Sequence, residues 1–312
     1  MNTIPPLLVI AGPTATGKSR LALHCARQWG AEIISADSRQ IYRHLDIGTG
    51  KPTPEERALV PHHMIDIVEP DQPYSAGEYG RSARSIIDAL HTQGTLPMLV
   101  GGTGLYIRAV IDGLAPSPPS DPRVKEDLLR RVEREGIHTL HRELMEVDPR
   151  IAKRLHPNDR QRILRAIEVF RISGRRLSDF HQDTGGDPRY RTIFFVLSRP
   201  RPELYELIDT RIDDMFAQGL IEEVQYLIEK GYTPDHPGMQ SIGYSRLYDH
   251  LTGRISLAEA RFAMKQDTQR YAKRQMTWFR KETRAHRLDV PAGGDVLDMV
   301  SVLERAIRCE RA

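Results

Sequence analysis

The sequence predicts an α/β protein in which a parallel sheet, covered by helices, is interrupted by an all-helical insertion. Three observations carry this prediction. Apolar runs of strand length alternate with helical patterns in the first third of the chain. A glycine-rich loop lies between the first apolar run and the first helical pattern. A proline-rich stretch then leads into an arginine-rich helical region, and another apolar run follows it.

The strands are predicted at four apolar runs, residues 7–11, 32–35, 96–100 and 192–197. Helices are predicted behind the glycine-rich loop, where Leu21, Cys25 and Trp29 recur at helical spacing, and over residues 79–90. Breaks at residues 114–122 and 185–188 separate a helical, arginine-rich region. We therefore expect a core made of residues 1–115 and 190–312, helical after Arg201, and a helical insertion domain at residues 116–189.

The composition is that of an ordinary globular protein. Of its 312 residues, 28% are charged and 39% are hydrophobic, and the net charge is only +3. The two cysteines, Cys25 and Cys309, are too few for a disulfide framework or a cysteine-based zinc module. No stretch approaches the ~20 apolar residues of a membrane span, and the N-terminus has no secretory pattern. These features favour a cytoplasmic protein that does not engage a membrane.

The glycine-rich loop is the strongest chemical signal. It matches G-x-x-x-x-G-K-[ST] and comprises Gly12, Pro13, Thr14, Ala15, Thr16, Gly17, Lys18 and Ser19. Such a loop wraps backbone N–H groups around a phosphate, and the helix behind it directs its positive end at the same anion. Lys18 supplies charge for the phosphates, and the Ser19 hydroxyl is placed to help hold Mg²⁺. The sequence therefore predicts a P-loop NTPase-like core that binds a phosphorylated ligand.

Asp37 follows the second predicted strand and is a candidate for chemistry. Ligands of open parallel sheets lie outside the carboxyl ends of the strands, so Asp37 would face the same crevice as the phosphate loop. A general base, an outer-shell partner of a metal and a cap of the next helix are all open roles for it.

Metal ligands outside the loop are weakly indicated. NTPases of this class use an acid at the end of an apolar strand, but residues 101–104 read Gly-Gly-Thr-Gly. Asp66 lies inside an apolar run and is a weak substitute. His62 and His63 have no third ligand at suitable spacing and are expected to be structural. The missing acid argues against nucleotide hydrolysis.

Two segments combine positive charge with helical patterning. In residues 158–170, Gln161, Arg162 and Arg165 share one face, opposite an apolar stripe. Residues 261–287 contain nine Lys or Arg residues but only two acidic ones, with aromatic residues between them in the sequence. One such helix is more often a solvated surface, but two in one chain favour a surface that binds RNA.

Taken together and in this order, the motifs resemble the tRNA dimethylallyltransferase family, also called tRNA isopentenyltransferase. Besides the phosphate loop, the matching stretches are residues 37–42 (DSRQIY), 49–52 (TGKP), 62–66 (HHMID), 101–106 (GGTGLY), 158–168, 242–244 (IGY) and 271–280 (YAKRQMTWFR). Gly50 stands where the family usually has alanine. The chain lacks the C-terminal zinc finger of eukaryotic members, so the resemblance is to the bacterial type.

The resemblance implies transfer of a dimethylallyl group from dimethylallyl diphosphate to N6 of adenosine 37 in tRNA, with Mg²⁺. In the family pattern Asp37 is the general base, and Thr14, Lys18 and Arg211 stabilise the departing diphosphate. Gln40 and Thr103 would contact the extruded adenosine. The other residues implied in tRNA binding are Ser38, Arg39, Lys125, Gln161, Arg162, Ile163, Leu164, Arg165, Gln240, Ser241, Ile242, Gly243, Tyr244, Ser245, Lys273, Arg274, Gln275, Met276, Thr277, Trp278, Phe279 and Arg280.

The expected partners are dimethylallyl diphosphate and a tRNA anticodon stem–loop with adenosines at 36 and 37, bound by a monomer. The helical insertion would clamp the stem, with residues 116–122 as a hinge. From the residues alone, three other functions stay open. A small-molecule kinase using ATP leaves the basic helices unexplained, and so does a prenyltransferase acting on free adenine nucleotides. An RNA-binding protein without group-transfer chemistry is the third.

Overall fold

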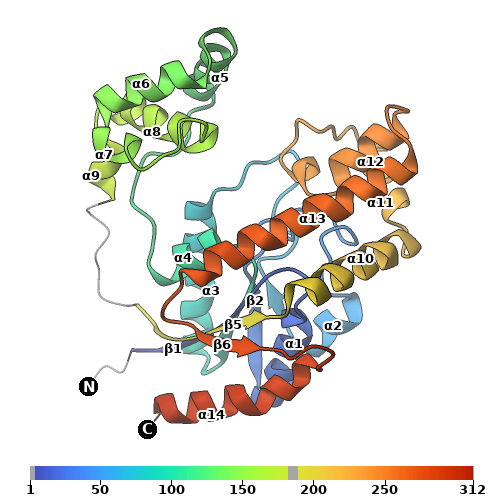
Figure 1. The fold of residues 1–312 in the computed structure, drawn as a ribbon. Coiled ribbons are helices and arrows are strands. Elements are labelled where there is room, and N and C mark those ends of the chain that lie inside the picture. The colour runs from blue at the N-terminus through green and yellow to red at the C-terminus, as the bar shows by residue number, and fades with distance from the viewer. Residues whose placement is uncertain (1–3, 182–188, 312) are drawn as a thin grey trace. The chain divides into compact units, whose positions relative to one another are not determined.

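The computed structural model describes residues 4–181 and 189–311 (Figure 1). The chain divides into two compact units, residues 1–111 with 188–312 and residues 112–187. These junctions lie a few residues from the boundaries expected at 116 and 189. The break predicted at residues 185–188 lies outside the described residues.

The larger unit contains a six-stranded parallel sheet with the strand order β3-β2-β4-β1-β5-β6. The four predicted strands are confirmed to within one residue at each end. The strands are β1 (Pro6–Ala11), β2 (Ala31–Ser35), β3 (His62–His63), β4 (Leu96–Gly101), β5 (Arg191–Ser198) and β6 (His286–Asp289).

The two edge strands, β3 and β6, are not predicted from the sequence. The expectation of helix throughout the chain after Arg201 is wrong at β6, which pairs with β5. Only Leu288 of β6 is buried, so the strand has no apolar run from which it could be predicted. β3 is a two-residue strand on the opposite edge and is too short to show any period. Edge strands pair on one side only and can be short and polar.

Helices cover both faces of the sheet. Leu7 and Val9 of β1 point into a core shared with α3 (Ala76–Thr92), α4 (Gly104–Ile111) and the helices that follow β5. Leu8 and Ile10 point to the other face, which packs on α1 (Lys18–Trp29) and α14 (Val300–Arg311). This alternation is the period of a strand buried on both sides. The remaining helices of this unit are α2 (Pro54–Leu59), α10 (Arg201–Ala217), α11 (Leu220–Glu229), α12 (Tyr244–Leu251) and α13 (Leu257–Arg280), with short 3₁₀ turns at Gly238–Gln240 and Val296–Met299.

The smaller unit is entirely helical over its described residues. Its elements are α5 (Pro122–Glu135), α6 (Ile137–Val147), α7 (Pro149–Ala152), α8 (Arg160–Ser173) and α9 (Leu177–Phe180). Leu128, Leu140 and Ile163 are among the residues of its own core. Pro122 does not end a helix but begins α5, where Asp121 accepts hydrogen bonds from the first backbone N–H groups.

The segment before α5 is attached to α8 by a buried carboxylate. Glu168 accepts hydrogen bonds from the Ser120 hydroxyl and from the Asp121 backbone N–H. Arg165 pairs with Glu168 at 2.7 Å and donates to the Pro118 carbonyl. The positive charge of Arg165 is therefore used inside the unit, where it holds the proline-rich segment.

No helix among residues 4–181 and 189–311 is long and apolar enough to cross a membrane.

Candidate functional site

Three loops meet at the carboxyl edge of the sheet, after β1, β2 and β4. The backbone of Ala36 joins two of them, because its N–H donates to Val100 at 2.7 Å and its carbonyl accepts from Thr103 at 3.0 Å. A Cβ on Gly101 would overlap the Ala36 carbonyl, so this approach requires glycine. Residues 36–38 and 101–104 are thus held together beside the phosphate loop.

The phosphate loop leaves the start of α1 open for an anion. The buried Thr16 hydroxyl donates to the Pro13 carbonyl at 2.9 Å and closes the loop on itself. α1 begins at Lys18 behind Gly17, and neither a side-chain cap nor an acid occupies its first turn. The first backbone N–H groups of a helix lack partners inside the helix and carry partial positive charge. This end of α1 is therefore suited to bind a phosphate.

Two cations lie close together at this loop. Burial and the nearby Arg211 lower the pKa of Lys18 to about 8, against the opposing effect of Asp37. Burial also lowers the pKa of Arg211, which belongs to α10. Within the part of the chain that the structure describes, the Arg211 guanidinium makes no hydrogen bond or ion pair, and it lies against Gly50, where a Cβ would overlap it. Two partly buried cations that form no ion pair with a described residue are suited to bind an anion.

Asp37 is the carboxylate of this site. One of its oxygens accepts the Arg39 backbone N–H at 2.8 Å, which fixes the side chain in a turn. No helix follows until α2 at Pro54, so the role of helix cap is wrong. The charge of Asp37 acts on Lys18 and on Arg211, which places the carboxylate near both cations.

One face of α13 covers these loops. Tyr271 bonds the Thr103 side chain, and burial followed by the charge of Asp37 raises its pKa to about 12. The Thr103 hydroxyl in turn accepts from the Ser38 backbone N–H at 3.0 Å. The indole of Trp278 lies where a Cβ on Gly104 would be, and 40% of this residue is exposed. α13 therefore contributes an aromatic edge to the site.

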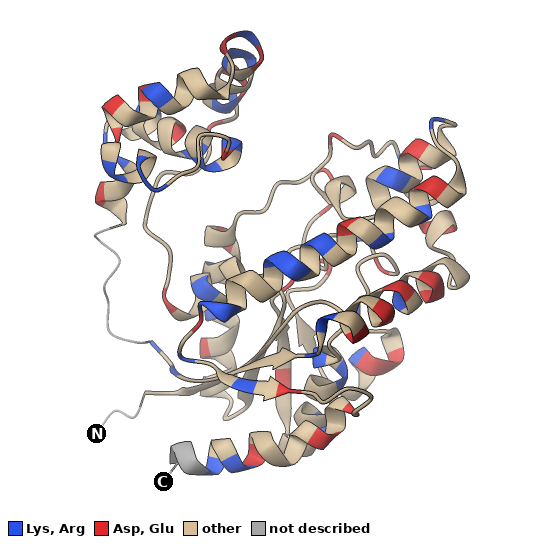
Figure 2. Cartoon of the chain, viewed as in Figure 1, with Lys and Arg blue, Asp and Glu red and all other residues tan. Residues whose placement is uncertain are grey.

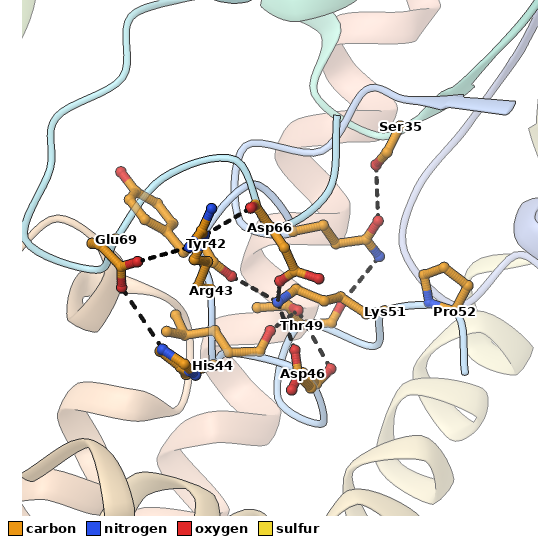
Figure 3. A network of polar contacts seen from close by, with 12 residues as sticks. Ser35, Tyr42, Arg43, His44, Asp46, Thr49, Lys51, Pro52, Asp66 and Glu69 are labelled. Atoms are coloured by element: carbon orange, nitrogen blue, oxygen red, sulfur yellow. Dashed lines mark hydrogen bonds and ion pairs between the residues drawn. The ribbon is translucent and has the colours of Figure 1, made fainter. Parts of the chain in front are cut away.

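A polar network beneath the site holds the loop that carries Gly50 (Figure 3). The Lys51 side chain is only 2% exposed, and its ammonium donates to the Tyr42 carbonyl at 2.7 Å and to Asp46 at 2.6 Å. It also pairs with Asp66 at 2.5 Å. Burial would raise the pKa of Asp66, but hydrogen bonds from Lys51 and Arg57 outweigh it and lower that pKa. Asp66 is thus a structural partner of Lys51 and Arg57, which argues against its suggested use as a metal ligand.

Gln40 belongs to the same network. Its carbonyl oxygen accepts from Ser35 at 2.8 Å, and its amide nitrogen donates to the Gly50 carbonyl at 3.0 Å. These bonds fix the amide in place, and the second lone pair of its oxygen has no hydrogen-bond donor among the described residues, so it can accept a bond from adenosine.

The histidine pair has protein partners. His62 shares a hydrogen bond with the Val60 carbonyl at 2.8 Å, and His63 lies 2.6 Å from Glu32 on the adjacent strand. Over the described residues, no group of three or more His, Cys, Asp or Glu side chains could hold a metal ion.

By burial, most of the residues expected to contact tRNA fall into three sets. Several are buried and make contacts inside the protein, in place of the RNA contact expected from the sequence: Ile163, Leu164, Ser241, Gly243, Tyr244, Gln275 and Phe279. The exposed ones are Lys125, Gln161, Arg162, Gln240, Lys273, Arg274, Thr277, Trp278 and Arg280. The others, Ser38, Arg39, Ile242, Ser245 and Met276, are half-buried.

The positive charge of α13 is neutralised in one half only (Figure 2). Arg261 and Lys265 pair with Asp213 at 3.0 and 2.9 Å, and Arg270 pairs with Asp267. Further along, Lys273 and Arg280 are exposed and form no ion pair with any described residue. The C-terminal half of α13 is therefore the part available to a polyanion.

Replacing Lys51 by methionine should lower the free energy of unfolding by about 2–4 kcal/mol. The reason is that Asp66, itself partly solvated, would lose its buried cation, together with the bonds to Tyr42 and Asp46. Urea unfolding measures the change. Lys265→Met is the matched control, since it removes a pair with exposed Asp213 and should cost about 0–1 kcal/mol. Equal losses for the two variants would contradict the structural role of Lys51.

Fold and site together define a P-loop NTPase-like α/β protein in which two cations, Lys18 and Arg211, and the carboxylate of Asp37 lie at the phosphate loop, without an acid at the end of β4. A family model for IPP transferase matches residues 40–282, and one for isopentenyl transferase matches residues 5–62. The chain belongs to the tRNA dimethylallyltransferase family, as its relatives also show.

It is 49% identical to a tRNA dimethylallyltransferase of Syntrophobacter fumaroxidans over 89% of this chain and 81% of the relative. It is 46% identical to one of Geobacter sulfurreducens over 95% of this chain and 96% of the relative. Among solved structures, the tRNA isopentenylpyrophosphate transferase of Staphylococcus epidermidis has a TM-score of 0.72 at 36% identity and covers 99% of this chain and 100% of that one. A eukaryotic dimethylallyltransferase acting on tRNA has a TM-score of 0.82 at 27% identity, over 97% of this chain and 78% of that one.

The site residues were not equally visible in the sequence. The phosphate loop and Asp37 follow strands directly and could be found from local pattern. Arg211 lies inside α10 with no local signal, and only the resemblance indicates it. Lys51 could not be recognised as a buried ion-pair partner, because Asp66 is 15 residues away in the chain.

Proposed function

We propose that this chain transfers a dimethylallyl group from dimethylallyl diphosphate to N6 of adenosine 37 in tRNA. The observation that carries the proposal is the placement of Asp37 close to Lys18 and Arg211, two cations without other charged partners in contact. A base beside a diphosphate site suits an attack by a weak nucleophile on a carbon that bears a diphosphate. Membership of the tRNA dimethylallyltransferase family supports the same reaction.

The phosphate loop would stabilise the leaving group. As the bond between the allylic carbon and the diphosphate oxygen breaks, negative charge grows on the diphosphate. Lys18, Arg211 and the N–H groups at the start of α1 are fixed donors for that charge, and the Thr14 hydroxyl is a further one. Preorganised donors aimed at developing charge are usually the largest single contribution to catalysis.

Asp37 would act on the other reactant. The exocyclic amine of adenine is a poor nucleophile, because its lone pair is delocalised into the ring. As the bond from N6 to carbon forms, one amine proton passes to the Asp37 carboxylate. Among the described residues, only one Asp37 oxygen has a hydrogen-bond partner, so the other can accept this proton. The products are the N6-dimethylallyl adenosine and free diphosphate.

Ser19 fits the role of a Mg²⁺ ligand. Its hydroxyl is exposed in the first turn of α1 and makes no hydrogen bond with a described residue. Mg²⁺ usually keeps several waters and binds substrate phosphates, so one protein hydroxyl suffices where no acidic cluster exists. When bound, the ion would supply further charge neutralisation for the diphosphate.

The tRNA would bind through exposed cations of the two helical regions. These are Lys273 and Arg280 on α13, and Lys125 and Arg162 in the helical unit. Adenosine 37 must leave its stack to reach Asp37, which costs a few kcal/mol. A phosphate-binding surface offsets that cost with contacts around the extruded base.

The proposal is tested by incubating the protein with radiolabelled dimethylallyl diphosphate and Mg²⁺. The acceptor is either unmodified tRNA with adenosines at 36 and 37, or AMP. We expect label in tRNA only, located at position 37. Label in AMP alone would favour a nucleotide prenyltransferase. A parallel incubation with ATP tests the kinase, which would be favoured by consumption of ATP without label transfer in the first assay.

Changing Lys273, Arg274 and Arg280 together to glutamine should weaken tRNA binding and reduce its salt dependence. Each lost phosphate contact lowers the slope of log affinity against log salt by about 0.7–0.9, so the triple variant should lose roughly two to three units. Filter binding from low to high salt measures the slope. The matched control changes Arg261, Lys265 and Arg270, three cations of the same helix that already have acidic partners, Asp213 on α10 and Asp267 on α13. The same fall in both triple variants would mean that the unpaired half of α13 has no special part in binding.

A further inference from the structure

A single buried side chain of α13 joins two loops of the site. Gln275 is only 5% exposed. Its carbonyl oxygen accepts the Thr14 backbone N–H at 2.9 Å, and its amide nitrogen donates to the Gly102 carbonyl at 2.9 Å. One amide therefore links the phosphate loop to the glycine turn after β4, across 261 and 173 residues of sequence.

The surroundings leave this amide little freedom. A Cβ on Gly102 would overlap the Gln275 nitrogen and come within 3.3 Å of the Gly12 carbonyl, so the turn lies directly against both. Tyr271 lies one turn before Gln275 and Trp278 one turn after it on the same side of α13, and they contact Thr103 and Gly104. Gln275 is the central contact in this row. A buried amide with both groups bonded is held rigidly, since losing either bond leaves a polar atom unsatisfied.

The bond to Thr14 has a specific consequence for the phosphate loop. The Thr14 N–H points to Gln275 and is not free to rotate toward an anion. This fixes the backbone of Thr14, and the backbone determines where its hydroxyl lies. The bond to Gly102 fixes the turn that carries Thr103. The two loops are thus held at one separation by a side chain that belongs to neither.

We propose that Gln275 is a positioning residue for the transfer reaction. It fixes the Thr14 hydroxyl, which would contact the diphosphate, relative to residues 101–104, which would contact the adenosine. This inference rests on the proposed function. Gln275 acts through Thr14 and does not touch either substrate. Its carbonyl and amide groups are both required, one for each loop.

The first test is Gln275→Met, which keeps length and volume but removes both bonds. We expect kcat for transfer to tRNA to fall by about 10- to 100-fold, the loss typical of small misplacement of reacting groups. Affinity for tRNA and for inorganic pyrophosphate should change less than about threefold, because the cations of the loop and of α13 remain. Gln269→Met is the matched control: this residue bonds Asp209, away from the loops, and its loss should leave kcat unchanged.

The second test is a double-mutant cycle with Thr14→Val. If Gln275 acts through the Thr14 hydroxyl, the double variant loses no more kcat than Thr14→Val alone. Multiplied losses would overturn the inference. So would a normal kcat in Gln275→Met with a lowered melting temperature, since that is the result of a purely structural residue. If Gln275→Met does not fold, Gln275→Asn takes its place in the cycle, because it keeps a buried amide but is one methylene too short to reach Thr14 and Gly102 as Gln275 does.

The wild-type protein separates this inference from the proposed function. A wild type that transfers no label to tRNA would reject the function, whatever the variants do. A wild type that transfers label, with Gln275→Met behaving like Gln269→Met, would reject the positioning role alone.

Discussion

Replacing Asp37 by asparagine is expected to lower the rate of transfer to tRNA by about 10²- to 10⁴-fold, the usual contribution of a positioned general base. Asparagine keeps the oxygen that accepts the Arg39 N–H, so the turn should survive. It cannot take up the proton that leaves N6. The large loss should therefore appear in the chemical step, without a comparable loss in the binding of either substrate.

Single-turnover transfer with excess enzyme measures this step directly, and filter binding gives the tRNA affinity of the same variant. Asp213→Asn is the control. That carboxylate is on α10, two residues from Arg211, but it pairs with Arg261 and Lys265. Full single-turnover activity in Asp37→Asn would remove Asp37 as the base.

Replacing Arg211 by glutamine is the change with the next largest expected effect. We expect kcat to fall by about 10²- to 10³-fold, as for the loss of one preorganised donor to a developing anion. Pyrophosphate should also bind more weakly, because Arg211 has no acidic contact among the described residues and its charge is free to act on the ligand. Steady-state transfer and calorimetric titration with pyrophosphate measure the two effects.

Arg261→Gln provides the comparison for Arg211→Gln. Its guanidinium pairs with Asp213 on an exposed surface, so its removal should leave both measurements nearly unchanged. An Arg211→Gln variant that binds pyrophosphate as tightly as the wild type would contradict the assignment of Arg211 to the diphosphate.

The sequence predicts most reliably what is built from contiguous residues. The phosphate loop has its strand before it and its helix behind it, and the four central strands are apolar runs, so both are visible locally. The edge strand β6 is not, because only Leu288 is buried and its pairing with β5 is what makes it a strand. Its stability comes from a partner about 90 residues away.

Charge was harder to interpret than hydrophobic pattern. Arg165 and Gln275 both lie in segments whose composition favours RNA binding. A helical wheel does not show that Arg165 pairs with the buried Glu168, so Arg165 looks available to a phosphate. The same holds for Asp66, whose chemistry depends on Lys51 beneath it. In each case the role depends on tertiary contacts, which cannot be inferred from the periodicity of a helix or strand.

The glycine turn after β4 has a consequence for genetics. Gly104 is short of space because of a side chain, Trp278, whereas Gly101 is short of space because of backbone, the Ala36 carbonyl. Alanine at 104 should therefore be suppressible by a second mutation to a smaller residue at 278. Alanine at 101 should have no suppressor at position 36, since every amino acid carries the same carbonyl. A selection for revertants would thus distinguish two glycines of one motif that look alike in the sequence.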